Sequence, residues 1–246
     1  PNGVFLMGLH GCAIDFEYGS HMDINTDGGL AILIVSLLRI CAGGLMFIAA
    51  QCSSWVWLSR ATSERTISNP AGNPERAFVK LGNLLNDRCS LVCYIAHQIG
   101  VKWVIEQPTS SMFFVTPGLS AICKHVQAVR VHLFMVDFGH PARKGTVLVG
   151  TAGWLANFKA AGGGAQPSAS SSSTDQPQPT AKAKAKGKAK AKASLKASMK
   201  ALVRRRMKNG KEQVFGQKHE LKESQVYPAR FALAVVKAHW PANCSK

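Results

Sequence analysis

The sequence lacks the cysteine and histidine patterns of metal-binding and disulfide-bonded proteins. Its seven cysteines are odd in number and include no Cys-x-x-Cys pair, and its eight histidines show no metal-ligand spacing. The closest two cysteines, Cys89 and Cys93, have the i, i+4 spacing of a single helix face, which favours core packing. A zinc site and a disulfide framework are therefore disfavoured. Because no signal peptide is present either, we expect a reduced intracellular protein.

No apolar run in the sequence is long enough and uniform enough to predict a membrane span. The most apolar stretch, Leu30–Ala50, contains Arg39 near its middle and is broken by Gly43-Gly44. It is better divided into a helix that begins after Thr26 or Asp27 and a short strand that follows the glycines. We therefore expect no membrane partner, and a membrane-associated protein is the weaker alternative.

Acidic residues are missing from one segment, and this absence locates the positive charge. Between Ala181 and Lys211 there are ten lysines, three arginines and no acid, so the segment carries +13 of the formal net charge of +17. The remaining residues carry 17 basic and 13 acidic side chains. The folded part of the chain is therefore predicted to be nearly neutral, with the basic character confined to an insert.

The first 160 residues alternate short apolar runs with helical patterns. This alternation predicts an α/β domain with a mostly parallel, Rossmann-like sheet covered by helices on both faces. The expected strands are 12–16, 45–49, 101–105, 131–136 and 146–149. The expected helices are about 27–41, 75–99 and 119–129.

The composition changes after residue 160 and changes again after the basic segment. Residues 161–212 form a Gly/Ser/Pro/Gln linker followed by an Ala-Lys tract that ends in three arginines. Lysines at every second position repel one another on all sides of a helix, so this insert is predicted to be disordered. Residues 213–246 regain apolar periodicity, with a helix expected over 231–239. We expect this C-terminal element to pack back on the α/β domain.

Chemically competent side chains follow three of the predicted strands. Asp15 and Glu17 follow the first strand, Cys52 follows the second and Glu106 follows the third. Ligands of parallel α/β sheets bind outside the carboxyl ends of the strands. A cysteine and a carboxylate at neighbouring strand ends favour covalent catalysis with an acid partner. The structural alternatives are a buried packing cysteine, a helix-capping glutamate and solvated loop acids.

Three motifs, taken in order, resemble those of the C5-cytosine DNA methyltransferase family. Gln51-Cys52-Ser53-Ser54 is similar to the family's Pro-Cys nucleophile motif, and Glu106-Gln107-Pro108 to its Glu-Asn-Val motif. The stretch "GHPARKGT", residues 139–146, is similar to its Gly-x-Pro-Gln-x-Arg-x-Arg turn. The departures are Gln51 for proline, Gln107 for asparagine and the reduction of the arginine pair to Lys144 and Thr146.

The resemblance implies a reaction and a cofactor. Cys52 would add to C6 of a cytosine flipped out of the DNA, Glu106 would hold N3, and S-adenosylmethionine would supply the methyl group. Asp15 or Glu17 would hold the cofactor ribose, and Asp23 would face its adenine. The family's cofactor glycine loop has no counterpart before Cys12, so the first cofactor-binding strand is predicted to be missing from this chain.

Composition independently predicts a nucleic-acid partner, with DNA favoured over RNA. A run of positive charges without acids binds phosphate backbones and releases counterions, and it also suits a nuclear import signal. The predicted DNA-binding residues are Arg143, Lys144, Lys182, Lys184, Lys186, Lys188, Lys190, Lys192, Arg204, Arg205 and Arg206. The sequence thus predicts a divergent DNA (cytosine-5) methyltransferase-like protein, either active or inactive, located in the nucleus or elsewhere inside the cell. The alternative is a non-catalytic nucleic-acid-binding protein that acts through its basic insert.

Overall fold

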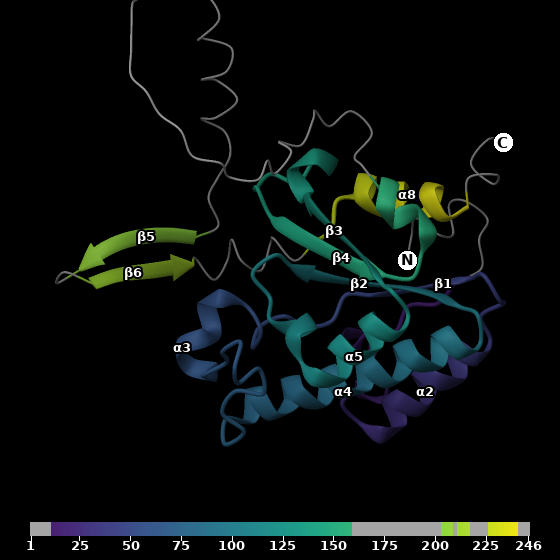
Figure 1. Ribbon diagram of the computed structural model, residues 1–246, viewed down its shortest axis with the longest axis horizontal. Helices are drawn as coiled ribbons and strands as arrows, with labels where there is room; N and C mark the ends of the chain where they lie inside the picture. Colours follow the sequence, from purple (N-terminus) through teal and green to yellow (C-terminus); the bar gives the residue numbers. More distant parts are fainter. Residues whose placement is uncertain (1–10, 159–202, 209–210, 217–225, 241–246) are drawn as a thin grey trace, which may run out of the picture.

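A four-stranded sheet between two layers of helices forms the centre of the molecule (Figure 1). The computed structural model describes residues 11–158, 203–208, 211–216 and 226–240. The sheet has the strand order β1-β2-β4-β3, and a separate two-stranded sheet pairs β5 with β6. The strands are β1 Leu45–Ile48, β2 Lys102–Pro108, β3 Val129–Phe134, β4 Gly145–Gly150, β5 Val203–Lys208 and β6 Lys211–Gly216.

Four of the five α-helices overlap the predicted helices, and the short helix α3 was not predicted. The helices are α2 Asp27–Leu38, α3 Arg60–Ser63, α4 Ala77–Gln98, α5 Pro117–His125 and α8 Ala229–His239. Thr26 caps α2 by accepting a hydrogen bond from Gly29 N at 3.0 Å. Gly100, with φ 75°, follows the end of α4 in the left-handed conformation that suits glycine. These caps confirm the predicted helix starting after Thr26 and the predicted long helix ending at Gly100.

Each face of the sheet has its own apolar core. Helices α2, α4 and α5 cover one face and α8 covers the other (Figure 1). Because side chains alternate along a strand, Trp103 and Ile105 of β2 join the α4 core while Val104 joins the core under Phe231 of α8. No helix of the described segments is long and apolar enough to span a membrane.

The sheet is mixed, so the predicted mostly parallel arrangement is not confirmed. Strand β1 pairs with β2 in parallel, but β4 pairs antiparallel with both β2 and β3. The short connection between β3 and β4 explains why these two strands are antiparallel. Only residues 135–144 connect these strands, with a 3-10 helix at Met135–Phe138, and this connection is too short for a parallel crossover.

Two further expectations about strands are wrong. Residues 12–16 form no strand; instead, a 3-10 helix at Phe16–Tyr18 is capped by Asp15, which accepts a hydrogen bond from Glu17 N at 3.0 Å. The predicted third strand does not end before Glu106, because β4 continues to pair with it. Glu106 lies opposite Leu148 and Pro108 opposite Thr146. Glu106 is therefore a residue within a strand.

Part of the predicted basic insert lies in a described strand. Residues 203–208, which include Arg204, Arg205 and Arg206, form β5 and pair with β6. The sequence between the two strands is Asn209-Gly210, the dipeptide most favourable to a two-residue hairpin. The rest of the predicted insert, including the lysines from Lys182 to Lys192, lies outside the described residues.

Candidate functional site

The structure brings Cys52 and Glu106 together, as the parallel pairing of β1 and β2 requires. Cys52 follows the end of β1 and is half-buried, and the side chain of Glu106 in β2 is 3% exposed. The two groups interact electrostatically, because the charge of Glu106 contributes to raising the pKa of the Cys52 thiol. A thiol and a carboxyl group therefore share one site.

The two oxygens of Glu106 have different surroundings. The hydroxyl of Tyr227 donates a hydrogen bond to Oε2. Oε1 is buried without a hydrogen-bond partner, and Lys144 Nζ lies 3.8 Å from it. Burial raises the pKa of Glu106, while Lys144, Tyr227 and Thr146 oppose this shift. Oε1 is thus a buried oxygen whose hydrogen bond a substrate could complete, by donating to it when Glu106 is ionised or by accepting from it when Glu106 is protonated.

Tyr227 is a site residue that the sequence prediction missed. It lies 121 positions after Glu106 in the chain and precedes α8. Its ring stacks on Phe231 with centroids 5.6 Å apart, and Lys144 Nζ lies 4.8 Å from its ring centroid. Burial and the charge of Glu106 raise the pKa of the Tyr227 hydroxyl, so it donates in its neutral form. The only signal in the sequence was Tyr227-Pro228 at a helix start.

Burial, together with the charge of Glu106, keeps the Cys52 thiol protonated at neutral pH. Burial is the largest cause of its raised pKa, followed by the charge of Glu106, whereas the Lys144 ammonium lowers it. Because the thiolate is the nucleophilic form of cysteine, this balance lowers the fraction of Cys52 present as the nucleophile. Lys144 faces both Cys52 and Glu106 and is the group that can stabilise either anion.

Gln107 connects the Cys52 loop to the sheet. Its side chain points to the α4 face of β2, is fully buried, and donates from Nε2 to Ala50 O at 2.7 Å. Ser111 Oγ donates to Gln107 Oε1 at 2.8 Å, which fixes the amide. Gln107, which stands where the methyltransferase motif has asparagine, therefore has a structural role, because it holds the backbone two residues before Cys52.

Arg65 holds the other side of the Cys52 loop. Its guanidinium, in a side chain only 1% exposed, donates to six oxygens: Ser54 O and Oγ, Pro70 O, Ala71 O, Val79 O and Asn83 Oδ1. Burial lowers its pKa to about 10, which still leaves it charged at neutral pH. No carboxylate pairs with Arg65 in the described part of the chain. The loop after Cys52 is therefore organised around a buried cation.

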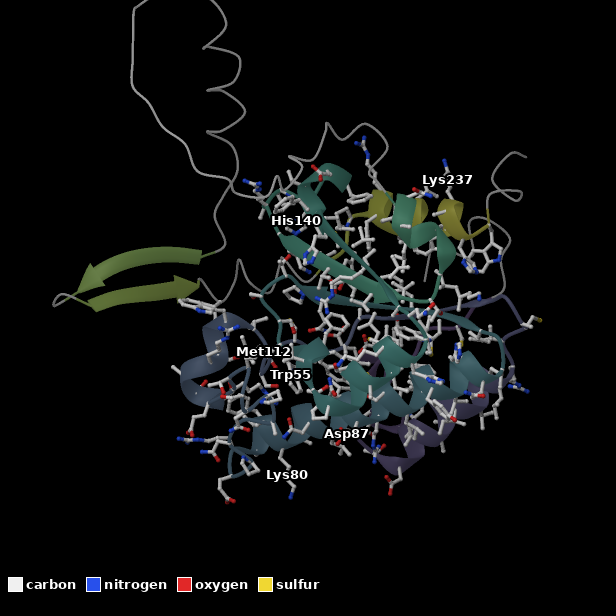
Figure 2. The ribbon with its side chains drawn as sticks, viewed as in Figure 1. Trp55, Lys80, Asp87, Met112, His140 and Lys237 are labelled. Atoms are coloured by element: carbon white, nitrogen blue, oxygen red, sulfur yellow. The ribbon has the colours of Figure 1, made fainter. Side chains whose placement is uncertain are left out.

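Trp55 and Gly82 complete this support. The Arg65 guanidinium carbon lies 3.4 Å from the Trp55 ring centroid, and Met112 N donates to Trp55 O at 2.9 Å. Figure 2 shows Trp55 and Met112 side by side under the sheet. A Cβ at Gly82 of α4 would lie 2.4 Å from Ser54 Oγ, so glycine lets the loop approach the helix. Trp55 is a core residue and does not face a ligand.

The predicted cofactor residues do not join the site. Asp15 and Glu17 are exposed, and the carboxylate of Asp15 caps its own 3-10 helix. Asp23 Oδ1 accepts a hydrogen bond from Asn25 N at 2.9 Å within a turn before α2. In the described part of the chain, no interaction connects Asp15, Glu17 or Asp23 with Cys52 or Glu106. The three acids therefore lie apart from the Cys52–Glu106 site, and S-adenosylmethionine stays a prediction from the family resemblance.

The predicted DNA-binding residues fall into three places. Lys144 belongs to the site, and Arg143 is exposed with its guanidinium carbon 4.3 Å from the Phe134 ring centroid. Arg204, Arg205 and Arg206 lie in β5. The predicted lysines from Lys182 to Lys192 lie outside the described residues. Within the described ranges no group of His, Cys, Asp and Glu side chains is arranged to hold a metal ion.

No family model, curated protein or solved structure matches the chain. A functional conclusion therefore depends on the chemistry of the site itself.

Proposed function

We propose that the chain is a divergent DNA (cytosine-5) methyltransferase-like protein whose Cys52–Glu106 site takes a cytosine flipped out of DNA. The observation that carries the proposal is Glu106 Oε1, a buried oxygen without a hydrogen-bond partner beside a half-buried cysteine. N3 of cytosine accepts a proton from such a carboxyl group, and the resulting N3–H then donates to the carboxylate that remains. The motif order described above supports the same assignment.

The described residues account for one chemical step. The Cys52 thiol loses its proton to solvent, and the resulting thiolate forms a bond from Sγ to C6 of cytosine. The displaced π electrons make C5 nucleophilic, and the Glu106 carboxyl transfers its proton to N3. The product is a neutral dihydrocytosine bonded to Cys52, with Glu106 left as a carboxylate. The raised pKa of Glu106 favours the protonated carboxyl group that this step needs.

Lys144 and Tyr227 stabilise the charges of this step. The Lys144 ammonium lowers the pKa of Cys52 and of Glu106, so it favours both the thiolate and the carboxylate product. The Tyr227 hydroxyl holds Oε2 of Glu106 and leaves Oε1 as the oxygen directed to substrate. Both residues act on the charged groups through contacts already formed in the structure.

S-adenosylmethionine would supply the methyl group to C5 in the complete reaction. Because no described contact connects Asp15, Glu17 or Asp23 with Cys52 or Glu106, we derive no step through this cofactor. The proposal is therefore limited to base binding and activation, and nuclear localisation is proposed only from the basic tract.

Exchange of the cytosine C5 proton tests the proposal without any cofactor. While Cys52 is bonded to C6, C5 takes a deuteron from D₂O; loss of the original C5 proton and of the Cys52 thiolate then restores the base. We expect DNA incubated with the full chain in D₂O to gain deuterium at C5, measured by mass spectrometry of the nucleosides. Cys52→Ser is expected to abolish the gain, and Cys41→Ser, at an exposed cysteine, to leave it unchanged. Equal exchange in both variants, or none with the wild-type chain, would refute the proposal.

A further inference from the structure

Strand β3 lies at the edge of the four-stranded sheet, and one of its faces is exposed. Side chains alternate between the two faces of a strand. One face packs into the core under α8 through Val129, Val131 and Leu133. The other face, which we call the β3 outer face, carries the exposed side chains Arg130, His132 and Phe134. Among the described strands only β4 pairs with β3, so this face borders an open edge of the sheet.

Phenylalanine rings hold two arginines at the two ends of the β3 outer face. The guanidinium carbon of Arg130 lies 4.9 Å from the ring centroid of Phe114, a buried residue of the 3-10 helix Phe113–Val115. The guanidinium carbon of Arg143 lies 4.3 Å from the ring centroid of Phe134. Stacking on a ring restricts a long side chain, so less conformational entropy is lost when its guanidinium binds a ligand.

The charges around the two arginines favour an anionic partner. Neither Arg130 nor Arg143 forms an ion pair with a carboxylate in the described part of the chain. Strands β3 and β4 contain no acidic residue. The connection between them contains one, Asp137, in the 3-10 helix that packs into the core under α8. Two positive charges therefore lie along this edge without an acid on either strand.

The distance between the two arginines suits the backbone of a nucleic acid. Arg130 and Phe134, on which Arg143 stacks, are four residues apart on one strand, which corresponds to about 13 Å. One strand of duplex DNA covers this length in about four base-pair steps. We infer that the β3 outer face binds the sugar-phosphate backbone of duplex DNA, with Arg130 and Arg143 each on a phosphate. Arginine suits this role because its planar donors match phosphate oxygens.

This inference rests on the proposed function, because it names the surface that would hold the DNA from which the base is flipped. Arg143 directly precedes Lys144, whose Nζ lies 3.8 Å from Glu106 Oε1. A phosphate on Arg143 would therefore lie beside the entrance to the Cys52–Glu106 site. The choice of DNA over RNA follows from the proposed substrate. Binding by the lysine-rich tract differs in one respect, because a tract acts through total charge and not through two fixed positions.

Substitutions that remove one charge at different positions distinguish these mechanisms. In the full chain, Arg130→Gln and Arg143→Gln are each expected to reduce the magnitude of the slope of log K against log [salt] by about 0.9. The double variant is expected to reduce it by about 1.8. Fluorescence anisotropy with a labelled DNA duplex of about 20 base pairs, at a series of salt concentrations, measures the slopes.

Lys80→Gln is the matched control, because it removes the same charge from an exposed residue of α4. Figure 2 shows Lys80 on the opposite side of the molecule from His140, which lies in the same turn as Arg143. The control is expected to keep the wild-type slope. Arg143→Lys is also expected to keep it, because that substitution preserves the charge.

Equal slopes for Arg143→Gln and Lys80→Gln would overturn the inference, because the position of the charge would then not matter. An unchanged slope in the double variant, or a reduced slope for Arg143→Lys, would overturn it as well. So would a difference that is seen on duplex RNA and absent on duplex DNA. These outcomes are separable from failure of the proposed function. Cys52→Ser is expected to abolish deuterium exchange at C5 but to keep the wild-type salt slope.

Discussion

Replacing Arg65 by methionine is expected to lower the free energy of unfolding by about 3 kcal/mol or more. The substitution keeps much of the side-chain volume but removes all six hydrogen bonds that the guanidinium donates. The buried carbonyls of Ser54 and Val79 lose their donors, and each unsatisfied group costs about 1–3 kcal/mol. Stacking of the cation on Trp55 is lost as well.

Thermal unfolding followed by circular dichroism measures this effect. For a chain of this size, about 3 kcal/mol corresponds to a fall in Tm of roughly 6–12 °C. The matched control is Arg60→Met, because Arg60 is exposed in α3 and its loss is expected to change stability by no more than about 0.5 kcal/mol. Equal Tm values for the two variants would show that Arg65 does not support the Cys52 loop.

Replacing Glu106 by glutamine is expected to change two properties of the site in opposite directions. Loss of the carboxyl proton donor should slow deuterium exchange at cytosine C5 by about 10²–10⁴-fold. Loss of the negative charge should lower the pKa of Cys52, because Glu106 raises that pKa in the wild-type chain. Cys52 is therefore expected to react faster with iodoacetamide at a given alkaline pH, although catalysis is slower.

Peptide mass spectrometry follows the alkylation of Cys52, with exposed Cys12 as an internal reference in the same sample. The opposite signs exclude general damage, because a misfolded variant would lose exchange and expose every cysteine alike. If exchange were unaffected by Glu106→Gln, Glu106 would not be the proton donor. If alkylation of Cys52 slowed, the electrostatic coupling of the two residues would be refuted.

The sequence predicted most of the elements that place Cys52 and Glu106. Helix α2, helix α4 and strand β1 have strong local signals, namely the Thr26 cap, Gly100 and the apolar run at Leu45, and local signals act independently of tertiary contacts. The closeness of Cys52 to Glu106 followed from expecting adjacent parallel strands. The pairing of β1 with β2 confirms that expectation.

The features that the sequence could not predict depend on contacts distant in the chain. Tyr227 contacts Glu106 because Phe231 packs α8 against the sheet, and no local sequence pattern predicts that contact. Arg65 resembles any surface arginine until the carbonyls that surround it are known. Strand β5 was not predicted because Val203 and Met207 are the only apolar residues in Val203–Lys208, and the segment follows a lysine-rich tract.

Covalent capture of DNA by Cys52 tests the central claim most directly. An oligonucleotide in which the target cytosine is replaced by 2(1H)-pyrimidinone adds thiols at C6 more readily, because it lacks the 4-amino group. We expect the full chain to form an adduct of protein plus oligonucleotide mass, with the modification mapped to Cys52 and absent from Cys52→Ser. An adduct mapped to another cysteine, or its persistence in Cys52→Ser, would contradict the account.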